Sequence, residues 1–341
     1  MKQISRRGYA RAGLLGNPSD GYHGKTISLI VGNFSAQVDM VSAERLTIQP
    51  GPKEGLEFEG IEQLAGRIQH DGYYGGVRLL KASIKRFYEF CLADSGREAE
   101  NFRIQYQSNI PRQVGLAGSS AIITAALRVL ADWYQVSLEP HLLASLTLSV
   151  EADLGIPAGL QDRVIQAYEG LVFMDFTHSK MQNDRGLSFG EYERLDPTLL
   201  PHLYVAFFSD KGQPTEVFHQ DLKKRFEAGD ATVVDAMKQF ADYAEQGRTA
   251  LLENDHEVLA RLIDQNFDLR RQLCQLHPDH VRLVDQARAA GASAKYCGSG
   301  GAIIGTYRDA EMLARLKKNL QAIDAHLIQP EVGLFQSPSG H

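Results

Sequence analysis

The chain has 341 residues, of which 43 % are apolar and 23 % charged, and its formal net charge is −6. A chain of this length and composition folds as one large or two smaller globular domains, and its core needs no disulfide or metal. The net negative charge argues against nucleic acid as the main partner. Because no run of 18 apolar residues occurs, we expect no association through a membrane span.

Cysteine usage and the N-terminus indicate the compartment. Cys91, Cys274 and Cys297 are odd in number and far apart in the sequence, which is typical of a reducing cytoplasm. The basic residues near the N-terminus are not followed by an apolar run, so we expect no signal peptide and a cytoplasmic location. The sequence leaves the oligomeric state open.

The first half of the chain alternates strand and helix patterns. Short-period alternation of apolar residues predicts strands, and helical spacing predicts helices. The predicted strands are 8–15, 26–49, 102–108 and 171–176. The predicted helices are 76–92, 120–134 and 139–154. Turn formers are concentrated at residues 16–24, between the first two strands.

The second half has longer helical patterns. Its predicted helices are 214–228, 231–252, 255–276, 279–290 and 309–323, and its predicted strands are 203–208, 294–296, 302–306 and 325–329. A polar segment at 178–201, with two glycines and two prolines, predicts a domain boundary. We therefore expect an α+β protein of two domains, residues 1–197 and 198–341.

The tripeptide Gly24-Lys25-Thr26 resembles the end of a P-loop. That pattern requires glycine at position 19, where Ser19 stands, and it requires a helix after the threonine. Residues 26–31 are instead β-branched and alternating, which predicts a strand. This tripeptide is therefore not expected to bind a nucleotide.

The segment Pro111–Ala121 is the strongest candidate for a phosphate site. It lies between a predicted strand and a predicted apolar helix, where small residues let the backbone approach a ligand and unpaired N–H groups face it. A simple serine N-cap is the alternative. The candidate phosphate-binding residues are Pro111, Gly115, Leu116, Ala117, Gly118, Ser119 and Ser120.

Two further segments are weaker when taken alone. Gly298, Ser299, Gly300 and Gly301 form a glycine-rich loop between apolar stretches, for which a tight turn is the simpler interpretation. Carboxylates at 151, 153 and 162 surround a Gly/Pro turn, where they could hold Mg²⁺ or accept a proton. A solvated helix end and a helix cap are the alternatives for these carboxylates.

Together these segments resemble the three ordered motifs of the GHMP kinases. The first motif is similar to residues 10–20, the second to residues 111–121 and the third to residues 298–301, so the resemblance covers nearly the whole chain. The phosphate loop has one additional residue, Gly-Leu-Ala-Gly-Ser-Ser, which the branch that phosphorylates D-glucuronate at O1 shares. The phrases YARAGLLGNPSDGYHGKTIS and AGLQDRVIQAYEGLVFMDF also resemble that branch.

The resemblance implies a fold and a set of roles. The implied fold has an N-terminal domain like domain 2 of ribosomal protein S5 and a ferredoxin-like C-terminal domain. Asp162 matches the catalytic base, and Arg11 matches the basic residue that keeps this base ionised. Ser120 and Glu151 match Mg²⁺ ligands, and the two glycine-rich loops match the ATP site. Asp20 matches a residue that binds a sugar hydroxyl, in a polar turn that includes Asn17.

A uronic acid also requires a partner for its carboxylate, and arginine suits this group best. Arg112 and Arg163 flank the two loops and Lys25 follows the first motif, although each of them could be a surface charge. The expected reaction is ATP-dependent phosphorylation of a sugar or uronic acid. Alternatives are another sugar as substrate, such as galacturonate, galactose or a heptose phosphate, a non-catalytic sugar sensor, and a serine hydrolase, for which the G-x-S-x-G pattern is missing.

Overall fold

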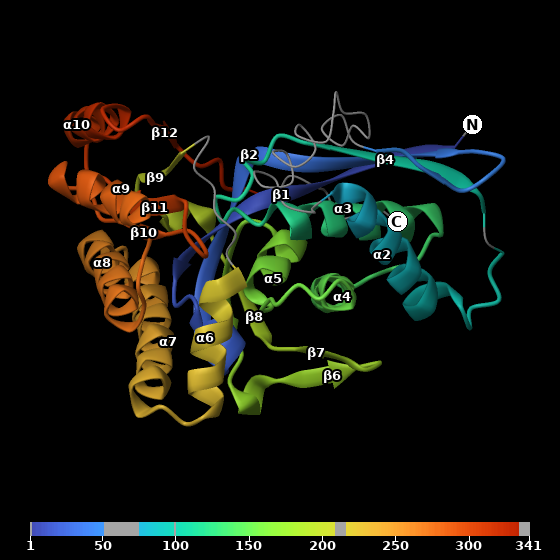
Figure 1. The fold of residues 1–341 in the computed structure, drawn as a ribbon, viewed down its shortest axis with the longest axis horizontal. Coiled ribbons are helices and arrows are strands. Elements are labelled where there is room, and N and C mark those ends of the chain that lie inside the picture. The colour runs from blue at the N-terminus through green and yellow to red at the C-terminus, as the bar shows by residue number, and fades with distance from the viewer. Residues whose placement is uncertain (1, 51–74, 99, 209–215, 334–341) are drawn as a thin grey trace, which may run out of the picture.

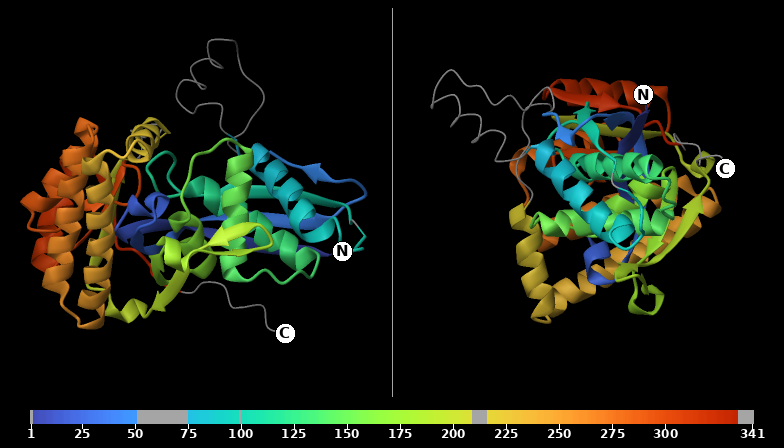
Figure 2. Two further views of the ribbon diagram at one scale, coloured as in Figure 1. Left: turned by 90° about the horizontal axis from the view of Figure 1, so that it is seen from below. Right: turned by 90° about the vertical axis from the view of Figure 1, so that its right-hand side faces the viewer.

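The computed structural model describes residues 2–50, 75–98, 100–208 and 216–333. It confirms the predicted α+β class: the molecule is elongated, with the first half of the chain at one end and the second half at the other (Figures 1 and 2). Each end contains a sheet with helices packed against it.

The first sheet is organised around its longest strand, β2. Its strands are β1 (Gln3–Leu15), β2 (Lys25–Ser42), β3 (Thr47–Ile48), β4 (Phe102–Ser108), β5 (Leu171–Asp175) and β8 (Glu191–Leu195). β1 pairs antiparallel with β2 along nearly its whole length, and the other edge of β2 is shared between β4 and β5. β1 therefore runs toward the second half of the molecule, where the turn at residues 16–24 lies (Figure 1).

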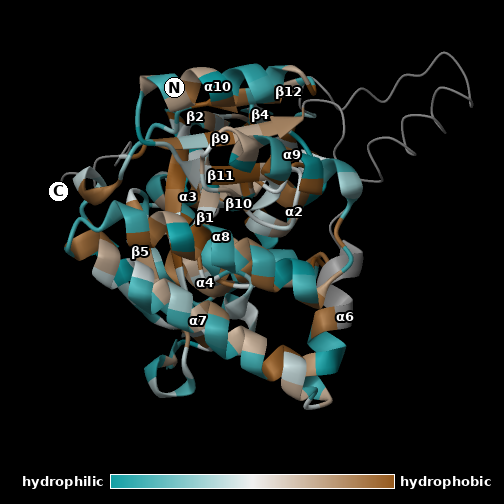
Figure 3. Ribbon diagram, turned by 90° about the vertical axis from the view of Figure 1, so that its left-hand side faces the viewer, coloured by the Kyte–Doolittle hydropathy of each residue, from teal (hydrophilic) through white to brown (hydrophobic). Residues whose placement is uncertain are grey.

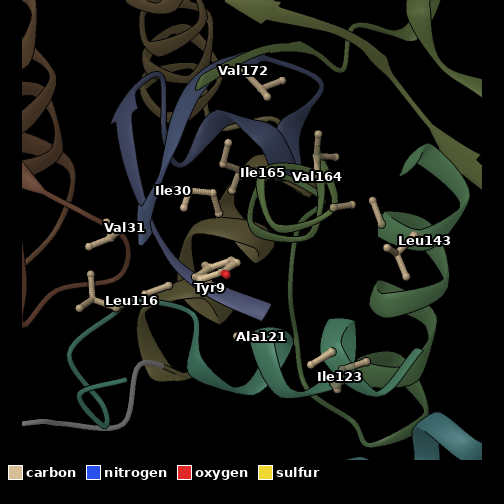
Figure 4. Packing of buried hydrophobic residues seen from close by; sticks show 14 of the residues in the cluster. Tyr9, Ile30, Val31, Leu116, Ala121, Ile123, Leu143, Val164, Ile165 and Val172 are labelled. Atoms are coloured by element: carbon tan, nitrogen blue, oxygen red, sulfur yellow. The ribbon is translucent and has the colours of Figure 1, made fainter. Parts of the chain in front are cut away.

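Four helices lie together on one side of this sheet (Figure 1). They are α2 (Gly76–Phe87), α3 (Gly118–Trp133), α4 (Pro140–Asp153) and α5 (Gln161–Tyr168). Figure 4 shows the core between them, where Tyr9 of β1 lies among side chains of α3 and α5. This apolar packing fixes α3 and α5, the two helices whose N-terminal ends carry the candidate site, against β1.

The second sheet has the order β10-β11-β9-β12, with antiparallel pairing throughout. Its strands are β9 (Leu203–Phe208), β10 (Lys295–Tyr296), β11 (Ala302–Thr306) and β12 (Ala325–Ile328). The helices of this half are α6 (Glu216–Glu227), α7 (Ala231–Leu252), α8 (His256–Leu273), α9 (Pro278–Ala289) and α10 (Ala310–Gln321). They carry both hydrophilic and hydrophobic surfaces (Figure 3), as expected for helices that pack on one side and face solvent on the other.

The segment 178–201 differs from expectation. Instead of a plain connection it contains the hairpin β6 (Gln182–Asp184) and β7 (Leu187–Phe189), followed by β8, which pairs with β5.

The predicted helix 76–92 ends as an α-helix at Phe87, and residues 88–92 form a π-helical turn. The first sheet ends with β8 and the second begins with β9, and the domain division at 197/198 remains a prediction. No helix in the described ranges is long and apolar enough to cross a membrane.

Gly8 allows the close contact between β1 and α3. A Cβ atom at this position would collide with the carbonyl oxygen of Ala121, which is helix backbone and cannot rotate away. We predict that Gly8→Ala lowers the free energy of unfolding by about 1–3 kcal/mol, the usual cost of overpacking. Urea unfolding followed by the fluorescence of Trp133, the single tryptophan, which lies on α3, measures the change.

Gly21→Ala is the control, because among the described residues a Cβ there meets no heavy atom within 4 Å apart from its chain neighbours. A Gly8→Ala protein as stable as the wild type would contradict the tight β1–α3 contact.

Candidate active site

Arg11, a buried side chain near the end of β1, connects three separate parts of the chain. Its Nε and Nη2 donate to Oδ1 and Oδ2 of Asp162 at 2.6 and 2.7 Å. Its Nη1 donates to the carbonyl oxygens of Gly115 at 2.6 Å and Cys297 at 3.3 Å. One guanidinium therefore holds the predicted base and both glycine-rich segments together, and its planar fork matches the carboxylate in a bidentate pair.

The phosphate loop, residues 111–120, leads directly into α3. Gly115 has φ +74°, and a Cβ on it would lie 2.7 Å from the carbonyl oxygen of Gly300, so both the backbone and the space require glycine. Ala117 also has a left-handed backbone, with φ 60°, and is the N-cap residue of α3. The first N–H groups of this 16-residue helix and the positive end of its dipole therefore face the loop.

The C-terminal glycine loop, residues 298–301, packs against the phosphate loop. A Cβ at Gly298 would lie 2.7 Å from the carbonyl oxygen of Gly115, and one at Gly301 would lie 2.8 Å from Cα of Val114. The resemblance to the GHMP kinases placed both loops at the nucleotide, and the structure brings them into contact. Their binding of a nucleotide remains a prediction.

Arg270 of α8 supports the C-terminal glycine loop and was not expected from the sequence. Its buried guanidinium donates to the carbonyl oxygens of Gly298 at 2.6 Å and Ser299 at 3.0 Å, and it lies over the ring of Tyr296. Burial lowers the pKa of Arg270 to about 10. No motif marks this residue, because it is about 30 positions from the loop that it contacts.

Gln166 connects α5, the helix that carries the predicted base, to the phosphate loop, and it was also missed. It lies four residues after Asp162, one turn along α5, and its side chain is fully buried. Its Nε2 donates to the carbonyl oxygens of Ala117 at 2.9 Å and Tyr9 at 3.0 Å. Its spacing from Asp162 was the available signal, but the sequence does not show which groups it reaches.

The turn between β1 and β2, residues 16–24, approaches the N-terminus of α5. The backbone N–H of Gln161 donates to Oδ2 of Asp20 at 3.3 Å, and a Cβ at Gly159 would collide with the same carboxylate. Burial, together with the negative charge of Asp162, raises the pKa of Asp20 to about 6. The two predicted substrate-facing carboxylates, Asp20 and Asp162, are thus brought to one place.

Glu151 and Arg163 form a buried ion pair. Both Nε and Nη2 of Arg163 contact Oε2 of Glu151, and Nη1 of Arg163 donates to the carbonyl oxygen of Gly159 at 3.0 Å and lies 3.4 Å from Oδ2 of Asp162. Burial raises the pKa of Glu151, and the positive charge of Arg163 opposes this rise. Arg163 is therefore engaged with protein carboxylates rather than presented at the surface.

The other predicted substrate contacts are placed as follows. Lys25 pairs with Glu245 at 2.5 Å and with Asp175 at 3.7 Å. Arg112 is exposed at the start of the phosphate loop. The amide oxygen of Asn17 accepts a hydrogen bond from Lys295 at 2.5 Å. The roles of these residues toward a substrate remain predictions.

The described residues contain no cluster of three or more His, Cys, Asp or Glu side chains suited to a metal ion. Ser120 and Glu151, the predicted Mg²⁺ ligands, are both buried. The Ser120 hydroxyl donates to the carbonyl oxygen of Ala117 at 3.2 Å, which leaves its oxygen lone pairs for a cation. Both Arg163 contacts fall on Oε2 of Glu151, so Oε1 lies outside that ion pair. A serine and a carboxylate suit Mg²⁺ that also binds nucleotide phosphates.

Comparison with known proteins identifies the family of this chain. Residues 79–170 match the GHMP kinases N terminal domain. The chain is 44 % identical over 309 residues to Glucuronokinase 1 of Arabidopsis thaliana, covering 88 % of this chain and 84 % of that protein. It is 43 % identical over 311 residues to Probable glucuronokinase 2 of the same plant, covering 88 % and 83 %.

Among solved structures, Lactococcus lactis galactokinase complexed with galactose has a TM-score of 0.76 at 15 % identity, covering 97 % of this chain and 94 % of that one, and so shares the fold. The chain belongs to the GHMP kinases. Within this family it is a sugar kinase that uses ATP, and it is related to the plant glucuronokinases.

We predict that Gln166→Met weakens nucleotide binding by about tenfold. Methionine has similar length but no N–H donor, so the carbonyl oxygen of Ala117 loses a buried hydrogen bond, worth about 1–1.5 kcal/mol. Calorimetric titration with ATP measures the dissociation constant. Gln182→Met, on an exposed strand of the β6–β7 hairpin, is the control. Unchanged ATP affinity in Gln166→Met would show that the phosphate loop does not depend on this contact.

Proposed function

We propose that the protein transfers the γ-phosphoryl group of ATP to the anomeric hydroxyl of D-glucuronate, giving glucuronate 1-phosphate. The observation that carries this proposal is the 44 % identity to Glucuronokinase 1 along most of both chains. It is supported by the guanidinium of Arg11, which contacts Asp162, the phosphate loop and the residue before the C-terminal glycine loop. The cytoplasm is the proposed compartment, since all three cysteines are free thiols.

Asp162 is proposed as the general base. Its carboxylate accepts the proton of the sugar O1 hydroxyl as the bond from O1 to the γ-phosphorus forms and the bond to the ADP oxygen breaks. Both carboxylate oxygens accept hydrogen bonds from Arg11, so the positive guanidinium favours the ionised form that a base requires. In-line positioning and neutralisation of charge supply the rest of the rate enhancement.

The backbone N–H groups at the start of α3 and in the phosphate loop are proposed to bind the phosphates. Ser120 and Glu151 are the proposed ligands of Mg²⁺, which when bound neutralises phosphate charge. Asp20 is proposed to accept hydrogen bonds from sugar hydroxyls. Because Asp20 and Asp162 are both acidic, a substrate that carries its own carboxylate needs a cation beyond them.

For that cation we keep three candidates, Arg112, Arg163 and Lys25. Arg163 contacts Glu151 and Asp162, and Lys25 contacts Glu245 and Asp175. Arg112 is exposed beside the phosphate loop. The fork of an arginine suits a carboxylate best.

A substrate panel tests the proposal. ADP release with Mg-ATP is measured against glucuronate, galacturonate, glucose, galactose and heptose phosphates. We predict the highest kcat/KM with glucuronate, and a distinctly higher value with another sugar would replace glucuronate as the proposed substrate.

Asp162→Asn should lower kcat by about 10²- to 10⁴-fold, the usual contribution of a general base.

Asp153→Asn is the matched control for the base. This residue lies two positions after Glu151, is exposed, and its carboxylate pairs with Lys85 at 2.7 Å. Its turnover should equal that of the wild type. Substantial turnover by Asp162→Asn would remove Asp162 from the proposed role.

A further inference from the structure

Lys295 is a buried lysine whose partners come from both halves of the chain. It lies on β10, three residues before the C-terminal glycine loop, and is 1 % exposed. Its Nζ donates to the carbonyl oxygen of Gly13 at 2.7 Å, to Oδ1 of Asn17 at 2.5 Å and to the carbonyl oxygen of Tyr296 at 2.9 Å. Gly13 lies two residues after Arg11 on β1, and Asn17 belongs to the turn that carries Asp20.

These three acceptors match the charged form of the side chain. An ammonium group has three N–H donors, and each of them is used, whereas a neutral amine has only two. All three acceptors are uncharged oxygens. Burial of a charge without an oppositely charged partner is unfavourable, and burial lowers the pKa of Lys295 well below its usual range. A neutral apolar side chain would avoid this cost, so stability alone does not account for a lysine here.

Neighbouring contacts show what the lysine holds in place. The backbone N–H of Gly13 donates to the carbonyl oxygen of Cys297 at 2.7 Å, so β1 is also tied to the strand that leads into the glycine loop. Oδ1 of Asn266 on α8 accepts a hydrogen bond from the backbone N–H of Gly16 at 2.8 Å. Nδ2 of the same side chain donates to the carbonyl oxygen of Asn17 at 3.2 Å. Asn17 is therefore fixed through its main chain and its side chain by the second half of the molecule.

We propose that Lys295 is a positioning residue for phosphoryl transfer, which sets the turn carrying Asp20 relative to the C-terminal glycine loop. The sugar-facing turn and the glycine loop come from opposite ends of the chain, and the ammonium group joins them through Asn17 and Gly13. Lys295 is buried, so its proposed role is to position other residues rather than to contact a substrate.

The test compares Lys295→Met with Ser293→Ala. Methionine keeps the length of the side chain and removes all three donors. Ser293→Ala removes two buried hydrogen bonds with Thr306 of β11, one with its hydroxyl at 2.8 Å and one from its backbone N–H at 2.9 Å, and so controls for general loosening of this sheet. We expect Lys295→Met to lower kcat by about 10- to 100-fold, because displacing a bound substrate by 1 Å has effects of this size. Ser293→Ala should keep kcat within about twofold of the wild-type value when it is measured below the temperature at which this variant unfolds.

A second measurement separates positioning from stability. The dissociation constant of the sugar is measured with and without a non-hydrolysable ATP analogue. In Lys295→Met the analogue should change sugar affinity less than it does in the wild type, because the turn and the glycine loop are no longer joined. Equal kcat and an equal effect of the analogue in Lys295→Met and wild type would overturn the proposal.

Asn17→Leu provides an independent route if Lys295→Met does not fold. It removes one acceptor and leaves the lysine in place, and it should reproduce the loss of kcat. Wild-type kcat in a folded Asn17→Leu protein would also overturn the proposal. All measurements use whichever sugar the wild-type enzyme phosphorylates best, so failure of glucuronate as substrate and failure of the Lys295 proposal give different results.

Discussion

The arrangement of the site depends on one buried guanidinium. Arg11 is placed by β1, which pairs along β2 from end to end, and it reaches Asp162 on α5, Gly115 in the phosphate loop and Cys297 beside the glycine loop. These three contacts are more than 100 residues from Arg11 in the sequence. Asp162, the proposed base, and both glycine-rich loops can therefore lie at one site only when both halves of the chain have folded.

Buried positive charge is concentrated around this site, although the chain as a whole has a net charge of −6. Arg11, Arg163, Arg270 and Lys295 are all buried, and they contact carboxylates or carbonyl oxygens of the loops. The cost of burying these charges is met by multiple hydrogen bonds to each group. Asp20, Glu151 and Asp162 lie among these cations, so the site holds buried charges of both signs that the net charge of the chain does not reveal.

The sequence predicted most of the strands and helices and located the three motifs, because these depend on local periodicity and on small residues at fixed spacing. It missed β8 and the β6–β7 hairpin, whose two strands of three residues each are too short to show a period. It also missed Gln166, Arg270 and Lys295, which act through contacts distant in the sequence. From the sequence, Arg163 was a candidate to bind the carboxylate of the substrate, whereas in the structure it pairs with Glu151, twelve positions earlier. A residue type indicates what a side chain can bind, and the fold selects among the partners.

The most direct test of the role of Arg11 is the affinity of Arg11→Lys for ATP. Lysine keeps the charge, but a single ammonium cannot hold the Asp162 carboxylate in a fork and also reach the two carbonyl oxygens. Loss of a hydrogen bond from a charged group is worth about 1.5–3 kcal/mol. Calorimetric titration should therefore show ATP binding weakened by about tenfold or more. Wild-type affinity in Arg11→Lys would contradict the conclusion that this guanidinium holds the phosphate loop and the glycine loop together.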